Sequence, residues 1–231
     1  MRTGRTMGTT TLGLTFGDRL LLIVGGPALG AVLGFCTPPV ADWVEGRPWV
    51  PMQGPFELIS SFEGRWVALV LGGVGLLLGL GLALLAVVSC LKVTVSDTRL
   101  VIEKDGRSRV IPRPEVAAVF LDGRKLVILD PASRELLRES HEGSAAQVAR
   151  GFQRHFYPWA GRDPHAGLYR RWVPETPDLP PAVNALLKAR ESALRKKDDD
   201  DTTELREEIQ RLGFVVRDDA AKQYWRPLIR P

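Results

Sequence analysis

Two long apolar stretches dominate the first 91 residues, and both have the length of a membrane-spanning helix. The second, Trp66 to Cys90, contains no charged residue and no proline. At about 1.5 Å rise per residue such a helix covers roughly 37 Å, enough to cross a hydrocarbon core of about 30 Å. The first, Leu20 to Cys36, contains Pro27 and several glycines, which bilayer helices tolerate, and Pro38-Pro39 are expected to end it. The pattern predicts a transmembrane hairpin with an interfacial loop over residues 18–91, behind a disordered tail at residues 1–17.

Small residues recur every four positions in both stretches, which places them on one side of each helix. They are Gly26, Gly30 and Gly34 in the first stretch and Gly75 and Gly79 in the second. Such stripes allow two helices to approach closely. We favour packing of the two helices on each other, and self-association into a homo-oligomer is the alternative.

The distribution of basic residues around the hairpin predicts its orientation. Arg47 and Arg65 are the basic residues of the loop, and the flanks carry Arg2, Arg5, Arg19, Lys92, Arg99 and Lys104. Because Lys and Arg accumulate on the cytoplasmic side, both termini of this two-helix, multi-pass cell-membrane protein are expected in the cytoplasm.

After Lys92 the pattern changes to alternating apolar positions rich in β-branched residues, which is typical of strands. Six short strands are predicted at residues 93–95, 100–102, 110–111, 116–121, 126–129 and 135–138. Asp105-Gly106 and Asp122-Gly123 are two-residue hairpin signals. Ser144 and Gln147 form a capping box that opens a helix. Residues 92–160 are therefore expected to form an antiparallel β domain closed by one helix.

The remaining chain predicts a proline-rich linker at residues 161–179 and a helical domain at 180–231. Pro180-Pro181 begin a first helix, and Asp198 to Asp201 precede a second whose natural end is Gly213. Two short apolar runs after Gly213 predict a closing β hairpin. The whole chain is thus expected to be an α+β membrane protein.

The order of elements and the stretch Glu115 to Gly123 give the middle domain a resemblance to the bacterial pleckstrin-homology (PH)-like domains. That resemblance implies a docking module for protein or lipid. Four basic residues are candidates to face anionic lipid headgroups: Lys104, Arg107, Arg109 and Arg113. The alternative, which we favour, is an ordinary solvated hairpin.

The C-terminal region resembles the anticodon-binding region of cysteinyl-tRNA synthetases. The residues that carry the resemblance follow the family's order: Arg190, Ala193, Leu205-Arg206, Leu212-Gly213, Val216, Asp218 and Trp225. It implies contacts to tRNA or another structured RNA through Arg190, Lys197, Arg206 and Trp225, although a core role for Trp225 is favoured. Four aspartates stand at the turn between the helices, where they would repel phosphate. Taken together, the chain resembles the YqeB-like membrane proteins of bacteria.

Composition and motifs disfavour several classes of function but do not identify one. The net charge of +4 is too small to demand a nucleic-acid partner, and two cysteines provide no disulfide framework. No synthetase nucleotide motif, phosphate-binding loop or metal-ligand spacing is present, so we expect no enzyme, cofactor or metal. The leading hypothesis is a membrane-anchored cytoplasmic protein that binds tRNA or a translation-linked partner. The alternative is a structural scaffold whose PH-like domain binds protein or anionic lipid, with no nucleic-acid role.

Overall fold

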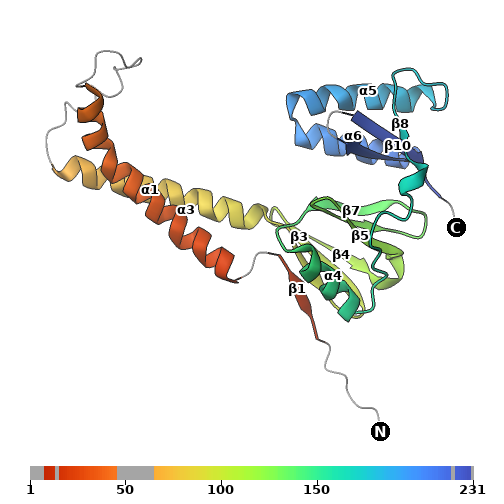
Figure 1. The fold of residues 1–231 in the computed structure, drawn as a ribbon, viewed down its shortest axis with the longest axis horizontal. Helices are drawn as coiled ribbons and strands as arrows, with labels where there is room; N and C mark the ends of the chain where they lie inside the picture. The colour runs from red at the N-terminus through yellow and green to blue at the C-terminus, as the bar shows by residue number, and fades with distance from the viewer. Residues whose placement is uncertain (1–7, 14–15, 46–64, 220–221, 230–231) are drawn as a thin grey trace, which may run out of the picture. The chain divides into compact units, whose positions relative to one another are not determined.

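The computed structural model describes residues 8–13, 16–45, 65–219 and 222–229 (Figure 1). They fall into two compact units: the long helices together with residues 103–108 form one, and the rest of the two folded domains forms the other. Residues 46–64, which carry the predicted interfacial loop, lie outside the described residues, as does most of the predicted N-terminal tail.

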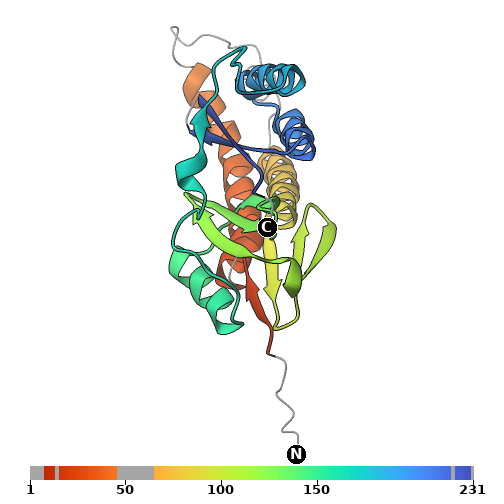
Figure 2. The same cartoon turned by 90° about the vertical axis from the view of Figure 1, so that its right-hand side faces the viewer.

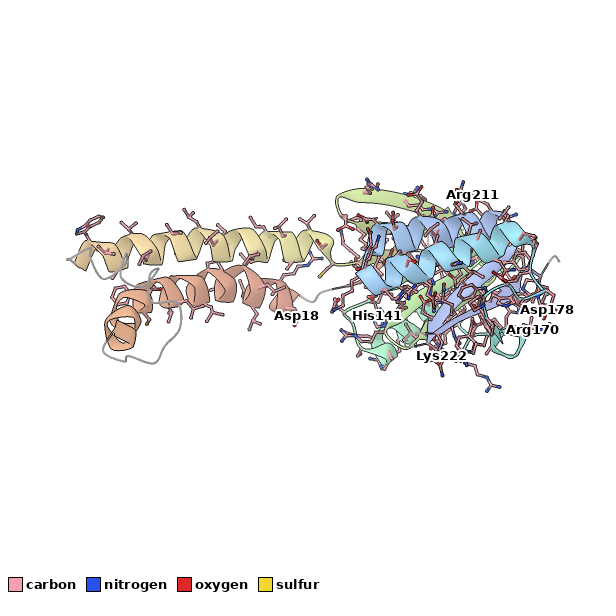
Figure 3. The ribbon with its side chains drawn as sticks, turned by 90° about the horizontal axis from the view of Figure 1, so that it is seen from above. Asp18, His141, Arg170, Asp178, Arg211 and Lys222 are labelled. Carbon is pink, nitrogen blue, oxygen red and sulfur yellow. The ribbon has the colours of Figure 1, made fainter. Side chains whose placement is uncertain are left out.

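The first unit is a pair of long helices, α1 (Phe16–Glu45) and α3 (Arg65–Ser89). Residues 17–37 and 66–89 of these helices are long and apolar enough to cross a membrane. Side chains project from the outer sides of both helices (Figure 3). Many of their leucines are exposed, among them Leu21 at 73% and Leu77 at 68%. A soluble protein rarely leaves so large an apolar surface uncovered. The pair therefore has the character of membrane helices and not of a soluble core.

Helix α1 runs through Pro38-Pro39 to Glu45, so the expected end at these prolines is wrong. The two prolines remove two backbone donors from the helical ladder, which weakens a helix locally without having to end it. Immediately before them, the Thr37 hydroxyl donates a hydrogen bond of 2.9 Å to the Leu33 carbonyl, one turn earlier in the helix.

The glycine stripes of α1 and α3 face each other within the chain. A Cβ atom added to Gly30 would overlap the carbonyl oxygen of Gly75, and one added to Gly75 would overlap that of Gly30. At Gly26 the added atom would lie 3.1 Å from the Gly79 carbonyl oxygen, and at Gly34 it would overlap the Leu71 carbonyl oxygen. The two backbones are thus in direct contact, which only residues without a side chain permit. Self-association through these stripes stays a prediction.

The β domain consists of a four-stranded sheet, a three-stranded sheet and one helix. The first sheet has the order β1 (Thr10–Leu12), β2 (Lys92–Val95), β3 (Arg99–Lys104) and β4 (Arg107–Pro112). The second has the order β5 (Ala118–Asp122), β6 (Lys125–Leu129) and β7 (Glu135–Ser140), and α4 (Ala145–Arg154) follows. The six expected strands and the capped helix are confirmed. Ser144 accepts a hydrogen bond from the backbone amide of Gln147, as a capping box requires.

Strand β1 corrects the predicted tail and the predicted start of the β domain. Thr10, Thr11 and Leu12 pair antiparallel with Val95, Thr94 and Val93. The Thr10 hydroxyl also lies 2.9 Å from the His155 ring, and the Leu12 side chain contacts Gly151 of α4. The first strand of the domain therefore precedes both long helices in the chain, and the helix pair is an insertion between two paired strands.

Only one of the two Asp-Gly pairs forms the expected turn. Asp105 and Gly106 have φ values of 50° and 71°, so both central residues of the β3–β4 turn are left-handed, as a type I′ turn requires. The second turn is Gly123-Arg124, in which Gly123 alone has a positive φ, of 62°. Asp122 belongs to β5, where its carboxylate is paired with Arg138.

The C-terminal domain packs two helices against one face of a three-stranded sheet. The helices are α5 (Pro181–Lys196) and α6 (Asp199–Arg211), side by side in Figure 2. The sheet has the order β8 (Arg170–Arg171), β10 (Lys222–Pro227) and β9 (Phe214–Asp219). Its core is formed by Trp172, Leu179, Val183, Leu187, Ile209, Val216 and Trp225.

The segment 161–179 is packed structure and not the extended linker that its prolines predicted. It supplies strand β8 and the buried ring of Trp172, whose Nε1 donates a 3.0 Å hydrogen bond to Asn184. Asp163 is also buried and accepts a 2.8 Å hydrogen bond from the His165 amide. The C-terminal domain therefore begins before Pro180.

Candidate functional site

The charged side chain at the centre of the C-terminal domain is Arg190 on α5, which is 1% exposed. Its two Nη atoms donate hydrogen bonds of 2.6 and 2.7 Å to the Asp218 carboxylate, and Nη1 also donates to Gln223 at 2.8 Å. Burial works to raise the pKa of Asp218, but the hydrogen bonds and charge of Arg190 outweigh it and hold that pKa below its usual value. Arg190 thus joins α5 to β9 and β10 and is not accessible to RNA in the folded domain.

The other three residues implied by the synthetase resemblance lie in different environments. Trp225 is 5% exposed and belongs to the core. Arg206 is half-buried, and burial lowers its pKa. Lys197 is exposed in the turn that ends α5, with a φ of 58°, directly before the aspartates that open α6. The four residues therefore do not form one surface.

The four candidate headgroup residues also separate. Arg113 is fixed in the β domain, because its guanidinium donates to the carbonyls of Asp97, His155 and Phe156 and lies 5.3 Å from the Tyr157 ring centroid. Arg109 is exposed and donates to a carbonyl of β7. Lys104 and Arg107, at the two sides of the β3–β4 turn, both line a pocket.

That pocket has a volume of about 370 Å³ and lies entirely within the unit of the long helices. Besides Lys104 and Arg107, it is lined by Arg19 of α1, by Lys92 at the start of β2 and by the end of α3. Sequence reasoning missed Arg19 and Lys92 as members of a site, since they lie far apart in the chain. The signal that was available is that both flank the apolar stretches, where basic residues meet the membrane surface.

A second polar arrangement joins the C-terminal domain to the β domain, and we call it the docking interface. Arg226 of β10 is fully buried, and its Nη1 and Nη2 donate hydrogen bonds of 2.9 Å to the hydroxyl and the carbonyl of Ser133. Gln210 of α6 accepts from the Glu135 amide at 2.9 Å and donates to the Glu135 carbonyl at 3.2 Å. The Ile229 amide donates to the Ser133 hydroxyl at 2.9 Å. The two domains are therefore held by directed hydrogen bonds.

Charges accumulate in the docking interface. Glu135 pairs with Arg138 at 2.9 Å, with side chains that are 5% and 6% exposed, and Arg138 also pairs with Asp122. Burial raises the pKa of Glu135 against the opposing effect of Arg138. Burial likewise raises the pKa of Tyr169 to about 12, although the ring lies beneath the Arg226 guanidinium at 5.5 Å. These groups are shielded from solvent, so they suit a structural role better than a catalytic one.

The face of the C-terminal sheet that turns away from α5 and α6 is basic and aromatic. Side chains alternate between the two faces along a strand, so Tyr224 lies on the face opposite to that of the core residue Trp225. In the sheet register Tyr224 pairs with Arg171 on one side and Arg217 on the other. Lys222 shares this face, and both Lys222 and Arg171 are exposed. Sequence reasoning missed this row because β8 is only two residues long.

Within the described residues, no three His, Cys, Asp or Glu side chains are grouped as a metal site would require. The two polar arrangements and the pocket belong to a protein with a PH-like β domain, an inserted apolar helix pair and a docked C-terminal α+β domain.

The chain belongs to the YqeB-like bacterial PH domain family, which residues 10–160 match. Residues 176–226 match the family described as the cysteinyl-tRNA ligase anticodon binding domain. The chain is 35% identical over 218 residues to "Uncharacterized protein YqeB" of Bacillus subtilis (strain 168), covering 94% of this chain and 91% of that protein. No solved structure matches the chain. The first match begins at β1 and includes the helix pair, as expected if the pair is an insertion within the domain.

Proposed function

We propose that the protein is a membrane-anchored, non-catalytic interaction protein whose two folded domains lie in the cytoplasm. The observation that carries the proposal is the pairing of β1 with β2, which brackets the helix pair. If both helices cross the membrane, the two ends of the pair must return to the same side, where the two strands can meet. The N-terminal residues, the β domain and the C-terminal domain then share one compartment.

The charge distribution indicates which compartment this is. Arg19 and Lys92 flank the outer ends of the apolar stretches together with Arg99 and Lys104, whereas the loop between the stretches has two basic residues. Basic residues next to membrane helices accumulate on the cytoplasmic side. Both termini are therefore assigned to the cytoplasm, and the loop to the opposite face.

Cysteine labelling in intact cells tests this topology. In a full-length chain that lacks Cys36 and Cys90, a Gln53→Cys variant should react with a membrane-impermeant maleimide before lysis. An Arg150→Cys variant, at an exposed position of α4, should react only after lysis. The reverse pattern would place the domains outside, and labelling of both before lysis would contradict an embedded hairpin.

A second candidate function, RNA binding by the C-terminal domain, is favoured by the row Arg171–Tyr224–Arg217 on the sheet face away from α5 and α6, next to the part of that face where Arg226 contacts the β domain. Arginines offer phosphate contacts, and a tyrosine between them offers a surface for base stacking. The opposite side of the domain is less suitable, since three aspartates occupy the first turn of α6. This candidate moves the RNA surface from the helices to the sheet.

Crosslinking of RNA to the full-length protein in cells, followed by sequencing, tests the second candidate. An Arg171→Glu, Lys222→Glu variant should lose the crosslinked RNA, while an Arg195→Glu, Lys196→Glu variant, with the same charge change at the end of α5, should keep it. Arg190 is unsuitable for this test because its replacement disrupts the fold. No RNA above background in the unsubstituted protein would reject the second candidate and leave the anchored interaction protein with a protein or lipid partner.

A further inference from the structure

We infer that the pocket at the ends of the long helices binds the phosphate of an anionic phospholipid such as phosphatidylglycerol. The inference rests on the membrane embedding proposed above and adds a ligand to it. The feature that carries it is a cavity of about 370 Å³ in which basic side chains from α1, β2 and the β3–β4 turn converge beside the last turn of α3. This volume is within the range of roughly 300–1,000 Å³ that is usual for small-ligand sites.

The charge of the pocket suits a phosphodiester. Four cationic side chains line it: Arg19, Lys92, Lys104 and Arg107. Glu103 is the carboxylate among the lining residues, and it pairs with Lys92 at 2.7 Å. The lining therefore carries an excess of three positive charges, although the exposed Asp105 carboxylate lies 4.0 Å from Lys104. A singly negative phosphodiester would reduce this excess.

Arg19 provides a donor for such a ligand. Its Nε atom is buried, and no described residue accepts a hydrogen bond from it. Buried donors are nearly always paired in folded proteins. Phosphate oxygens are preferred partners of guanidinium groups, which they bind through short, charge-assisted hydrogen bonds. A phosphate in the pocket would satisfy a donor that the protein itself leaves unsatisfied.

Apolar side chains from the end of α3 also line the pocket. They are Val87 and Val88 of α3 and Leu91, two residues after the helix ends. A lipid held by its phosphate would keep its glycerol and first acyl carbons against these side chains. A soluble phosphate compound shares the charge chemistry but has no apolar part to place there. The cavity accommodates a headgroup, and the acyl chains would lie along the exposed leucines of α1 and α3.

The β3–β4 turn holds two of the cations in position. The Asp105 amide donates a hydrogen bond of 3.3 Å to the carbonyl of Val88, near the end of α3. The turn that carries Lys104 and Arg107 is therefore attached to the helix end through its backbone. Attachment of this kind reduces the conformational entropy that a ligand would otherwise have to remove.

Native mass spectrometry of the full-length protein in detergent tests the inference. The protein is titrated with phosphatidylglycerol and, in parallel, with phosphatidylcholine. A Lys104→Gln, Arg107→Gln variant should bind phosphatidylglycerol at least about tenfold more weakly, since each basic residue near a membrane surface is worth about 1 kcal/mol, or roughly fivefold. Phosphatidylcholine binding should be weaker and should not differ between the two proteins.

Two further variants make the result specific. An Arg150→Gln, Arg154→Gln variant removes the same charge from exposed positions of α4 and should keep its affinity. A Lys104→Arg, Arg107→Lys variant keeps the charge and should restore binding, which excludes misfolding as the cause of a loss. Equal losses in the pocket and α4 variants, or equal binding of the two lipids, would overturn the site.

A soluble competitor separates the two sources of phosphate. Glycerol 3-phosphate should displace phosphatidylglycerol poorly, and displacement at equal concentration would show that the pocket takes a soluble phosphate and not a lipid. Carbonate extraction of each variant from membranes is measured alongside. A variant that stays in the membrane yet shows no selective lipid binding refutes this inference alone, whereas extraction of the unsubstituted protein refutes the proposed anchoring.

Discussion

Two packed interfaces of the molecule differ in the groups that they bury. Helices α1 and α3 meet through glycines, where backbone touches backbone at Gly30 and Gly75 and the small side chain of Ala83 faces Gly26. The docking interface between the β domain and the C-terminal domain instead buries Arg226, Glu135 and Arg138 and joins them by hydrogen bonds and ion pairs. The first interface excludes polar groups, and the second concentrates them.

If the helix pair is embedded in a membrane as proposed, the difference reflects the solvent in which each interface forms. In a bilayer the surrounding lipid is as apolar as leucine, so helix pairs gain stability from close van der Waals contact. In water, buried charges cost desolvation energy, and they are tolerated only when each finds partners of good geometry. The helix pair should therefore be sensitive to added volume, and the docking interface to lost partners.

The largest expected loss of stability follows from replacing Arg226. An Arg226→Met variant keeps the length of the side chain but removes the donors to the Ser133 carbonyl and hydroxyl, of which the hydroxyl keeps only the Ile229 amide. Two hydrogen bonds to a charged group, at about 1.5–3 kcal/mol each, predict a loss of about 3–6 kcal/mol in the free energy of unfolding. Hydrogen exchange of the β7 and β10 amides should rise accordingly. An Arg217→Met variant, which also removes a guanidinium from above the Tyr169 ring, should change exchange far less, and an equal rise would contradict the role of Ser133.

The next largest loss of stability is expected when a side chain is added between the two long helices. A Gly30→Ala variant adds one methyl group against the Gly75 carbonyl oxygen, so the helices must separate. Overpacking of this kind costs about 1–3 kcal/mol. The thermal midpoint of the detergent-solubilised protein should fall. A Gly25→Ala variant places the same methyl group where nothing lies within 4 Å, and its midpoint should be unchanged. Equal behaviour of the two variants would mean that this face is not the contact.

A smaller effect is expected at Ser133, which has a φ of 60° and so tolerates glycine. A Ser133→Gly variant removes only the hydroxyl, which accepts from Arg226 and from the Ile229 amide. The carbonyl contact survives, so the loss should be about 1–3 kcal/mol and smaller than in Arg226→Met. In the double variant the losses should be less than additive, and strict additivity in urea unfolding would show that the two residues are not coupled.

The smallest expected effect is a pH dependence of the free energy of unfolding. Burial raises the pKa of Glu135 above its unfolded value of about 4.3, although Arg138, Arg206 and Arg226 oppose the shift. A raised pKa means that the folded state binds the proton more tightly, so its contribution to stability is complete below about pH 4.3 and is lost as pH rises through the folded pKa. A Glu135→Gln variant should lack this decline in urea unfolding between pH 4.5 and 7. Asp218, whose pKa is lowered, loses its contribution only in acid and does not interfere.

Much of the fold could be predicted because its signals are local. Alternating apolar residues specify the strands of the β domain, Ser144 specifies the start of α4, and Asp105-Gly106 specifies its turn. The two apolar stretches specify the long helices by length alone. Each of these signals lies within a few residues of the element that it describes.

What could not be predicted depends on partners that are distant in the chain. Thr10 to Leu12 is too short to be read as a strand, and its partner follows about eighty residues later. Arg190 reads as a surface residue of a helix until the fold brings Asp218 and Gln223 to it. Arg19 and Arg107 become members of one pocket only because the helix pair returns the chain to its starting point.

The position of β1 has a consequence for how the protein is made. A ribosome releases β1 first and then both long helices before it releases β2, so the domain that begins at residue 10 cannot close until both helices have been made. If the helix pair spans the membrane as proposed, a chain in which only one of the two helices crosses leaves the β1 edge of β2 unpaired. Exposed strand edges are sites of aggregation and of recognition by quality control. With the proposed embedding, completion of the first sheet therefore requires that both long helices cross the membrane together.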